Sequence, residues 1–183
     1  MNIYQLSVHH DEQHDRLMLR LNTQDQTEFR FWLTRRMTMR LMPFVHQTAT
    51  RLEAAQPGVA ATDARSQTLL SEFKREAFLE KADFNTPYEN QACQWPLGPA
   101  PMLITEAHLS IKPGGSLEIC FEDKSDASQV RSCQLRLQMD LVHGMVHLIE
   151  QAFEKAQWGS GSALQSPIEQ GAVTRQEPPR FTH

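Results

Sequence analysis

The chain has 183 residues, of which 40% are hydrophobic and 22% charged, and its formal net charge is −4. This length and composition are typical of one globular domain that buries a core without disulfides. The net negative charge argues against a protein that binds nucleic acid over its whole surface. The charge is unevenly spread, however, because residues 16–51 hold seven arginines against two carboxylates. Such a basic segment indicates either an anionic partner or an acidic region of the same chain.

Three short segments open the chain with strand-like patterns. Residues 3–8 have the composition of a strand, and residues 16–22 and 28–33 alternate apolar and polar side chains. In the second segment Leu17 and Leu19 fall on one face, and an apolar face of this kind needs a covering layer. The pattern predicts an antiparallel meander with one face buried and the other exposed.

A helix is expected to follow this meander over residues 34–54, with Thr34 as its N-cap. Pro43 lies inside this helix and lacks a backbone N–H, so it predicts a kink or an early end. A second helix is predicted over residues 62–83. The Pro- and Asn-rich residues 84–101 then read as an irregular linker, which its aromatic side chains should pin to the body of the protein.

The second half of the chain repeats the order of the first. Alternating segments predict strands at 102–111, 117–122 and 132–139. A helix is then expected over residues 141–157, and Asp140 stands where its N-cap should be. The second half therefore has three strands followed by one helix, as the first half does.

This recurrence predicts the architecture. Residues 29–47 and 135–153 both run from a strand through a capping residue into an apolar helical stripe. We therefore expect an α+β fold in which a duplicated βββα unit forms one six-stranded antiparallel sheet with the helices on one face. The expected organisation is one domain over residues 1–157, with pseudo-repeats 1–55 and 102–157, a helix and linker at 56–101, and a disordered tail at 158–183.

The outward face of the first meander is expected to be basic and aromatic. The side chains predicted to form it are Arg16, Arg20, Arg30 and Trp32, extended by Arg35, Arg36 and Arg40 at the start of the following helix. Proteins that bind single-stranded nucleic acid use such a face, because cations neutralise phosphates and aromatic rings stack on bases. In the alternative interpretation these arginines pair with Glu118 and Glu122 or with another subunit, and the linker covers Trp32.

Five histidines lie in pairs or clusters. His143 and His147 are four residues apart on a predicted helix, which is the spacing of two metal ligands. No glutamate follows His143 directly, so the HExxH motif is absent, and we interpret the pair as part of an exposed helix face. His9, His10 and His14 fall in a predicted turn and receive the same interpretation. We therefore expect no metal site.

The three cysteines form no CxxC pair, and they are expected to be reduced thiols. Cys133 should face the core, whereas Cys93 or Cys120 would need a neighbouring base to act as a nucleophile. The sequence has no phosphate-binding glycine loop and no nucleophile elbow. It also has no evident signal peptide and no apolar stretch long enough to span a membrane, so we expect a cytoplasmic protein.

One segment resembles a known group of sequences. Residues 15–36, DRLMLRLNTQDQTEFRFWLTRR, resemble a segment of small uncharacterised proteins of proteobacteria, and the resemblance weakens after residue 55. Those proteins have no assigned activity, so the resemblance implies no functional residue. A repeated meander plus a helix is also similar in topology to the PUR-repeat and Whirly class of single-strand nucleic-acid binders. Those repeats generally have four strands before the helix, and three are predicted here.

The sequence favours a non-catalytic interaction module that uses its sheet face. The partner would be another protein or a second copy of the chain, which would give a homodimer. The alternative function is single-stranded nucleic-acid binding through the arginines and Trp32. An enzyme is the third class, and it would require a buried pocket with a cysteine or histidine beside a charged partner. No cofactor is expected.

Overall fold

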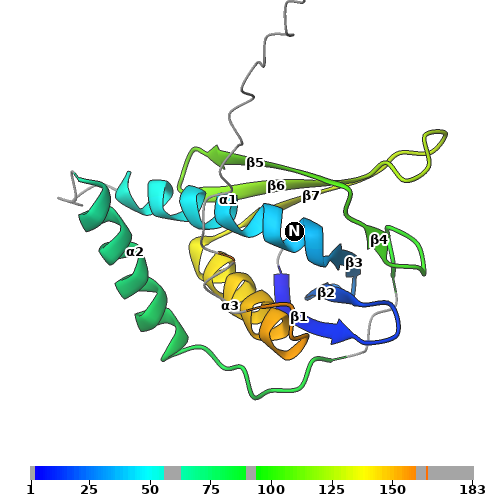
Figure 1. The fold of residues 1–183 in the computed structure, drawn as a ribbon, viewed down its shortest axis with the longest axis horizontal. Helices are drawn as coiled ribbons and strands as arrows, with labels where there is room; N and C mark the ends of the chain where they lie inside the picture. The colour runs from blue at the N-terminus through cyan, green and yellow to red at the C-terminus, as the bar shows by residue number, and fades with distance from the viewer. Residues whose placement is uncertain (1–2, 56–62, 90–93, 160–163, 165–183) are drawn as a thin grey trace, which may run out of the picture.

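A computed structural model describes residues 3–55, 63–89, 94–159 and 164 (Figure 1). The chain opens with three antiparallel strands, β1 (Ile3–Asp11), β2 (Arg16–Thr23) and β3 (Glu28–Thr34). Leu17, Leu19 and Leu21 are fully buried while the residues between them are half-exposed, as the alternation predicts. Strand β1 is longer than expected, because the residues after Val8 continue to pair with β2 as far as Asp11.

The second half contains four strands. They are β4 (Met102–Leu103), β5 (Glu106–Lys112), β6 (Ser116–Asp123) and β7 (Arg131–Leu137). Strand β4 runs parallel to β3, whereas β5, β6 and β7 pair with one another in antiparallel fashion. The apolar residues of β6 alternate as predicted, and Leu117, Ile119 and Phe121 are buried.

The expected single six-stranded sheet is wrong. The described strands form one sheet in the order β1-β2-β3-β4 and another in the order β5-β6-β7. The reason lies at residues 104 and 105, where the expected strand 102–111 is broken. The N–H of Ile104 donates to the carbonyl of Trp32, and the N–H of Thr105 donates to the carbonyl of Glu122, so one segment passes from the first sheet to the second.

Three helices complete the described part of the chain, α1 (Arg35–Ala54), α2 (Ala64–Leu79) and α3 (Met139–Lys155). The hydroxyl of Thr34 accepts a hydrogen bond from the N–H of Met37 at 3.1 Å and caps α1, as predicted. Helix α1 continues through Pro43 and does not end early. Asp140 is not the cap of α3; it lies inside the first turn, where its carboxylate complements the helix dipole.

The helices connect the two sheets. Helix α1 follows the first sheet but lies along β5, and α3 follows the second sheet but lies along β1. Figure 1 shows α1 running beside the upper sheet and α3 beside β1. The apolar faces of both sheets therefore share one core, in which the rings of Phe31 and Phe121 meet at 5.2 Å between centroids.

The α+β class is confirmed, with three strands before α1 in the first half and four before α3 in the second. That the halves are copies of one unit stays a prediction. Trp158 and Leu164, which were assigned to the tail, are buried with the core residues. Apart from Trp158, Gly159 and Leu164, the tail expected at 158–183 lies outside the described residues.

We expect Phe121→Ala to lower the free energy of unfolding by about 3–5 kcal/mol, because it removes a fully buried ring at the junction of the two sheets. Urea unfolding followed by far-UV circular dichroism measures this change. Phe73→Ala is the matched control, since Phe73 on α2 is 68% exposed and its loss should change stability by less than about 0.5 kcal/mol. Equal effects of the two variants would contradict a core shared by both sheets.

Candidate functional site

The predicted residues on β2 and β3 share one face of the first sheet. The register sets Arg20 of β2 directly opposite Arg30 of β3. Arg16 of β2 and Trp32 of β3 lie an even number of residues from this pair, so they point to the same face. All four are half-exposed, whereas the leucines of the opposite face are buried. The strand pattern therefore located this face.

The connector between α2 and β4, residues 80–101, covers part of this face; its residues 90–93 lie outside the described part. The ring of Tyr88 lies 4.2 Å from the guanidinium of Arg20, and the ring of Trp95 lies 5.4 Å from that of Arg30. Arg30 also donates to the carbonyl of Pro99 at 2.5 Å. These two arginines are thus engaged by cation–π contacts within the molecule. The prediction that aromatic residues pin the linker to the body is confirmed.

Glu28 anchors the connector. Its carboxylate is 8% exposed and accepts hydrogen bonds from the Tyr88 hydroxyl and the Trp95 indole N–H, both at 3.1 Å. Burial and the nearby Glu28 charge raise the pKa of Tyr88 well above its usual value, so the hydroxyl remains a donor. Glu118 and Glu122, considered above as partners of the arginines, pair instead with Lys112 and Lys124.

The remaining predicted residues lie at the other end of the face and on α1. Trp32 is half-buried, and its ring contacts that of His14 at 5.5 Å between centroids. Arg35, Arg36 and Arg40 are exposed on the first two turns of α1. The structure therefore divides the predicted set, because the connector holds Arg20 and Arg30 while the arginines of α1 stay open to solvent.

The interpretation of His143 and His147 as an exposed pair is wrong. His143 is 4% exposed, and its Nε2 lies 2.9 Å from the Glu53 carboxylate, which is buried in α1. The ring of His147 contacts that of Phe84 in the connector in a tilted arrangement, with 4.8 Å between the centroids. Helices α1 and α2 pack on the side of α3 that was expected to face solvent, and only tertiary packing decides this.

A second polar cluster ties α2 to the other helices. Glu150 of α3 accepts a hydrogen bond from Arg75 of α2, and its carboxylate lies 3.3 Å from His46 of α1. Burial alone would raise the pKa of Glu150, but the hydrogen bond from His46 and the charge of Arg75 outweigh it and lower the pKa below its usual value. Because α2 has no fully buried residue, such polar contacts contribute strongly to its position.

Burial argues against a nucleophilic role for Cys133. Burial raises the pKa of Cys133 to about 11, so its thiol stays protonated at neutral pH. Cys120 is half-buried on the outer face of the second sheet, and both thiols are free. Cys93 lies outside the described residues.

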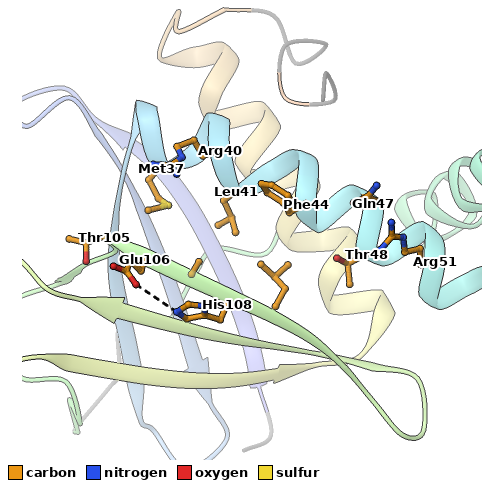
Figure 2. A pocket seen from close by; sticks show the side chains of 12 residues that line it. Met37, Arg40, Leu41, Phe44, Gln47, Thr48, Arg51, Thr105, Glu106 and His108 are labelled. Carbon is orange, nitrogen blue, oxygen red and sulfur yellow. Dashed lines mark ion pairs between the residues drawn. The ribbon is translucent and has the colours of Figure 1, made fainter. Parts of the chain in front are cut away.

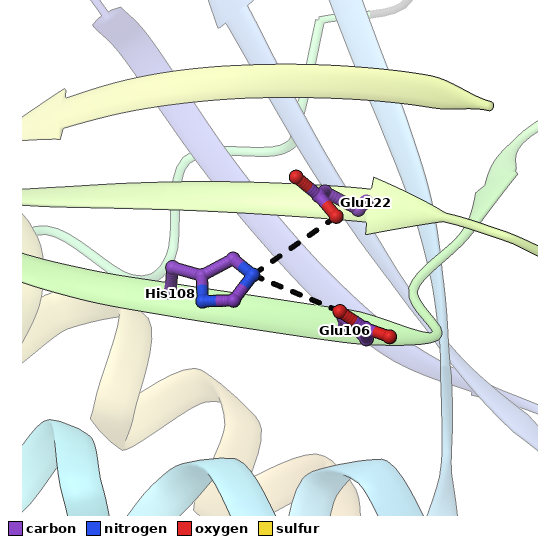
Figure 3. A group of neighbouring side chains, drawn as sticks. All are labelled: Glu106, His108 and Glu122. Atoms are coloured by element: carbon purple, nitrogen blue, oxygen red, sulfur yellow. Dashed lines mark ion pairs between the residues drawn. The ribbon is translucent and has the colours of Figure 1, made fainter.

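One cluster has the composition of a metal site. In Figure 3 one edge of the His108 ring faces two carboxylates. Its Nε2 lies 3.7 Å from Glu106 and 4.0 Å from Glu122. Lys124 already binds both carboxylates, with its Nζ 2.6 Å and 2.9 Å from them. These two hydrogen bonds raise the pKa of Lys124 above its usual value, so a cation would have to displace an ammonium group. The cluster is exposed, and we assign it no metal.

A groove with a volume of about 800 Å³ lies between α1 and β5. Figure 2 shows Met37, Leu41 and Thr48 pointing from α1 toward the strand. Phe44 lies in the middle of this groove and is 50% exposed. The apolar floor continues to Leu109 on β5.

Charged groups stand along the groove. Arg40 and Arg51 line it from α1, whereas Glu106 and His108 line it from β5. Sequence analysis missed this site because α1 was assigned a single apolar stripe. The signal was present, however, since Phe44 and Thr48 follow Leu41 at helical spacing and widen the apolar face of α1 beyond its buried residues.

The comparisons with known proteins add no constraint, since no protein-family model, curated protein or solved structure matches the chain. Within the described residues, no helix is both long and apolar enough to cross a membrane. The functional argument therefore depends on the geometry of the site.

We expect Glu150→Gln to lower the free energy of unfolding by about 2 kcal/mol at pH 7, because it removes charge-assisted hydrogen bonds from a buried position. A carboxyl whose pKa is lowered in the folded state contributes stability above its unfolded pKa, and this contribution is lost as the pH falls through the folded value. The difference between wild type and variant should therefore shrink below about pH 4. Urea unfolding at several pH values measures it.

Glu76→Gln is the control for this series, since Glu76 is an exposed residue of the same helix as Arg75. We expect it to change stability by less than about 0.5 kcal/mol at every pH. If Glu150→Gln lowered the free energy of unfolding by the same amount at neutral and at acidic pH, this would contradict the lowered pKa of Glu150 in the folded protein.

Proposed function

We propose that this chain is a non-catalytic interaction module and that the groove between α1 and β5 binds an extended segment of a partner protein. The observation that carries the proposal is the position of β5, which is the outer strand of its sheet and borders an open groove. Within the described part of the chain, β6 is the only strand that pairs with β5.

An edge strand beside a helix offers two kinds of recognition. Every second residue of an edge strand turns its backbone N–H and C=O outward, and an added strand can pair with them. Side chains of the added strand would then meet the apolar residues that line the groove, above all Phe44 and Leu109. A volume of about 800 Å³ suits several residues of a bound segment.

The charges along the groove favour an acidic segment. Arg40 is exposed at one end and Arg51 is exposed farther along the same helix. Both would attract carboxylates of a partner and fix the register of the added strand.

The surroundings of His108 support binding over catalysis. His108 lines the groove but its side chain is 64% exposed, and Lys124 occupies both neighbouring carboxylates. An exposed histidine of this kind lacks the water-excluded environment in which enzymes place acid–base groups. The free thiols of Cys120 and Cys133 fit a reducing compartment, so we include a cytoplasmic location in the proposal.

Self-association would use the same edge. If β5 paired with β5 of a second copy in antiparallel fashion around Leu109, Glu106 of each chain would face Lys112 of the other. A homodimer of this form is therefore one outcome of the test below.

Single-stranded nucleic-acid binding is the alternative function. The observation that favours it is the exposure of Arg35 and Arg36 at the end of the face that carries Trp32. The connector already holds Arg20 and Arg30, which leaves fewer cations for phosphates. The similarity in topology to PUR-repeat and Whirly proteins stays a prediction.

To test the groove, peptides would be selected from a phage-displayed random library on the immobilised full-length protein. We expect the selected peptides, synthesised with a fluorophore, to bind with a Kd of about 1–100 µM. Phe44→Glu should weaken this binding at least about tenfold, because it places a charge in the middle of the apolar floor.

Phe73→Glu is the matched control, since Phe73 is an exposed phenylalanine of α2 outside the groove, and it should leave the affinity unchanged. The proposal would be overturned if no peptide were selected, or if Phe44→Glu and Phe73→Glu lowered the affinity for the peptide equally. Light scattering on the same proteins identifies a homodimer, and a dimer that dissociates with Phe44→Glu would make a second copy the occupant.

For the alternative function, the measurement is fluorescence anisotropy of labelled single-stranded DNA at low and physiological salt. The nucleic-acid hypothesis expects a Kd of about 10 µM or tighter at low salt that weakens steeply as salt is added. Arg36→Glu should weaken it about tenfold, while Arg65→Glu on α2 should have little effect. Absence of binding even at low salt would remove this function.

A further inference from the structure

The molecule has a second groove of the same construction. It lies between α3 and β1, and β1 is the outer strand of the first sheet as β5 is of the second. The third, sixth and tenth residues of α3, which are Leu141, Gly144 and Leu148, line this groove. The third, sixth and tenth residues of α1, which are Met37, Arg40 and Phe44, line the open one. The same positions of each helix thus face the neighbouring edge strand.

The chain itself fills this second groove. The ring of Phe78, at the end of α2, lies 3.7 Å from where a Cβ of Gly144 would stand. Phe84 of the connector then contacts His147 of α3. The space that remains is about 320 Å³, against about 800 Å³ in the open groove.

The connector also bonds to β1. The side-chain amide of Gln5 donates to the carbonyl of Pro87 at 3.4 Å, and its oxygen accepts from the N–H of Glu89 at 3.0 Å. Residues 78–89 therefore run between the helix and the edge strand and contact both. In the folded protein this type of groove thus accommodates an aromatic segment that leaves the last turn of α2 and continues as irregular chain.

The sixth helix position distinguishes the two grooves. Gly144 leaves room for the ring of Phe78, whereas the open groove has Arg40 at the equivalent place. A segment in the open groove must therefore present a carboxylate near this guanidinium. The connector itself has this composition, since Phe78 and Phe84 flank Glu80 and Asp83.

We infer that the open groove recognises an acidic segment of another protein with aromatic side chains beside its carboxylates, and that residues 78–89 are its intramolecular counterpart in composition. This inference rests on the proposed function of the groove. It specifies which side chains the partner segment carries. Its aromatic rings would pack on the apolar floor at Phe44, and its carboxylates would pair with Arg40 and Arg51.

The test uses a fluorescein-labelled peptide of residues 78–89, FLEKADFNTPYE, titrated with the full-length protein and followed by anisotropy. We expect a Kd below about 100 µM. Arg40→Glu should weaken binding at least about tenfold, whereas Arg65→Glu, an exposed arginine of α2 outside the groove, should not. Both substitutions are at exposed positions, and circular dichroism checks that the variants are folded.

A charge-reversed peptide with Glu80→Lys and Asp83→Lys tests whether the carboxylates of the peptide pair with Arg40. It should bind wild type poorly and regain affinity for the Arg40→Glu protein, which a non-specific apolar contact would not show. A peptide that bound equally to wild type and Arg40→Glu would have displaced the connector from the α3/β1 groove, and this result would overturn the inference.

The outcomes also separate this inference from the proposed function. If the connector peptide fails to bind while library peptides bind and are lost with Phe44→Glu, the groove is a binding site of different specificity and the inference is wrong. If neither class of peptide binds, the proposed function fails as well.

Discussion

The structure depends on one apolar core that two sheets share. Each sheet buries only one face, and neither carries its own helix over that face; α1 lies along β5 and α3 along β1. The contact of Phe31 with Phe121 joins the faces, and the helices close the sides of the core. Because each helix lies beside an edge strand of the opposite sheet, the arrangement produces two helix–strand grooves. The candidate site is therefore a direct consequence of how the core is closed.

A buried carboxylate gives the connector a fixed path across the first sheet. Glu28 has little access to water, so its oxygens need donors, and Tyr88 and Trp95 supply them. The same two rings lie against Arg20 and Arg30, and the guanidinium of Arg30 lies 3.7 Å from the Glu28 carboxylate. The face that would have suited a nucleic acid thus became partly an internal interface. The same connector also lines the α3/β1 groove, so one segment both fills that groove and covers part of the arginine face of the first sheet.

The two grooves differ at one helix position. Glycine at residue 144 lets a phenylalanine of the chain itself approach the helix, while arginine at residue 40 places a charge where that ring would lie. Helix α2 contacts Glu150 through Arg75 and has no buried residue, so the occupant Phe78 belongs to the least buried of the described helices. The two grooves therefore differ in charge at this position, although helix and edge strand are arranged alike in both.

The local elements can be predicted from the sequence, because strand alternation and helix capping are properties of neighbouring residues. The buried leucines of β2, the cap at Thr34 and the common face of Arg20 and Arg30 all follow from such patterns. Which surfaces meet, in contrast, depends on tertiary packing. The break at residues 104 and 105, the burial of His143 against Glu53 and the cover over the arginines depend on contacts between residues that are distant in sequence. The groove along β5 belongs to this second class, because it exists only where a helix from one half lies against an edge strand of the other.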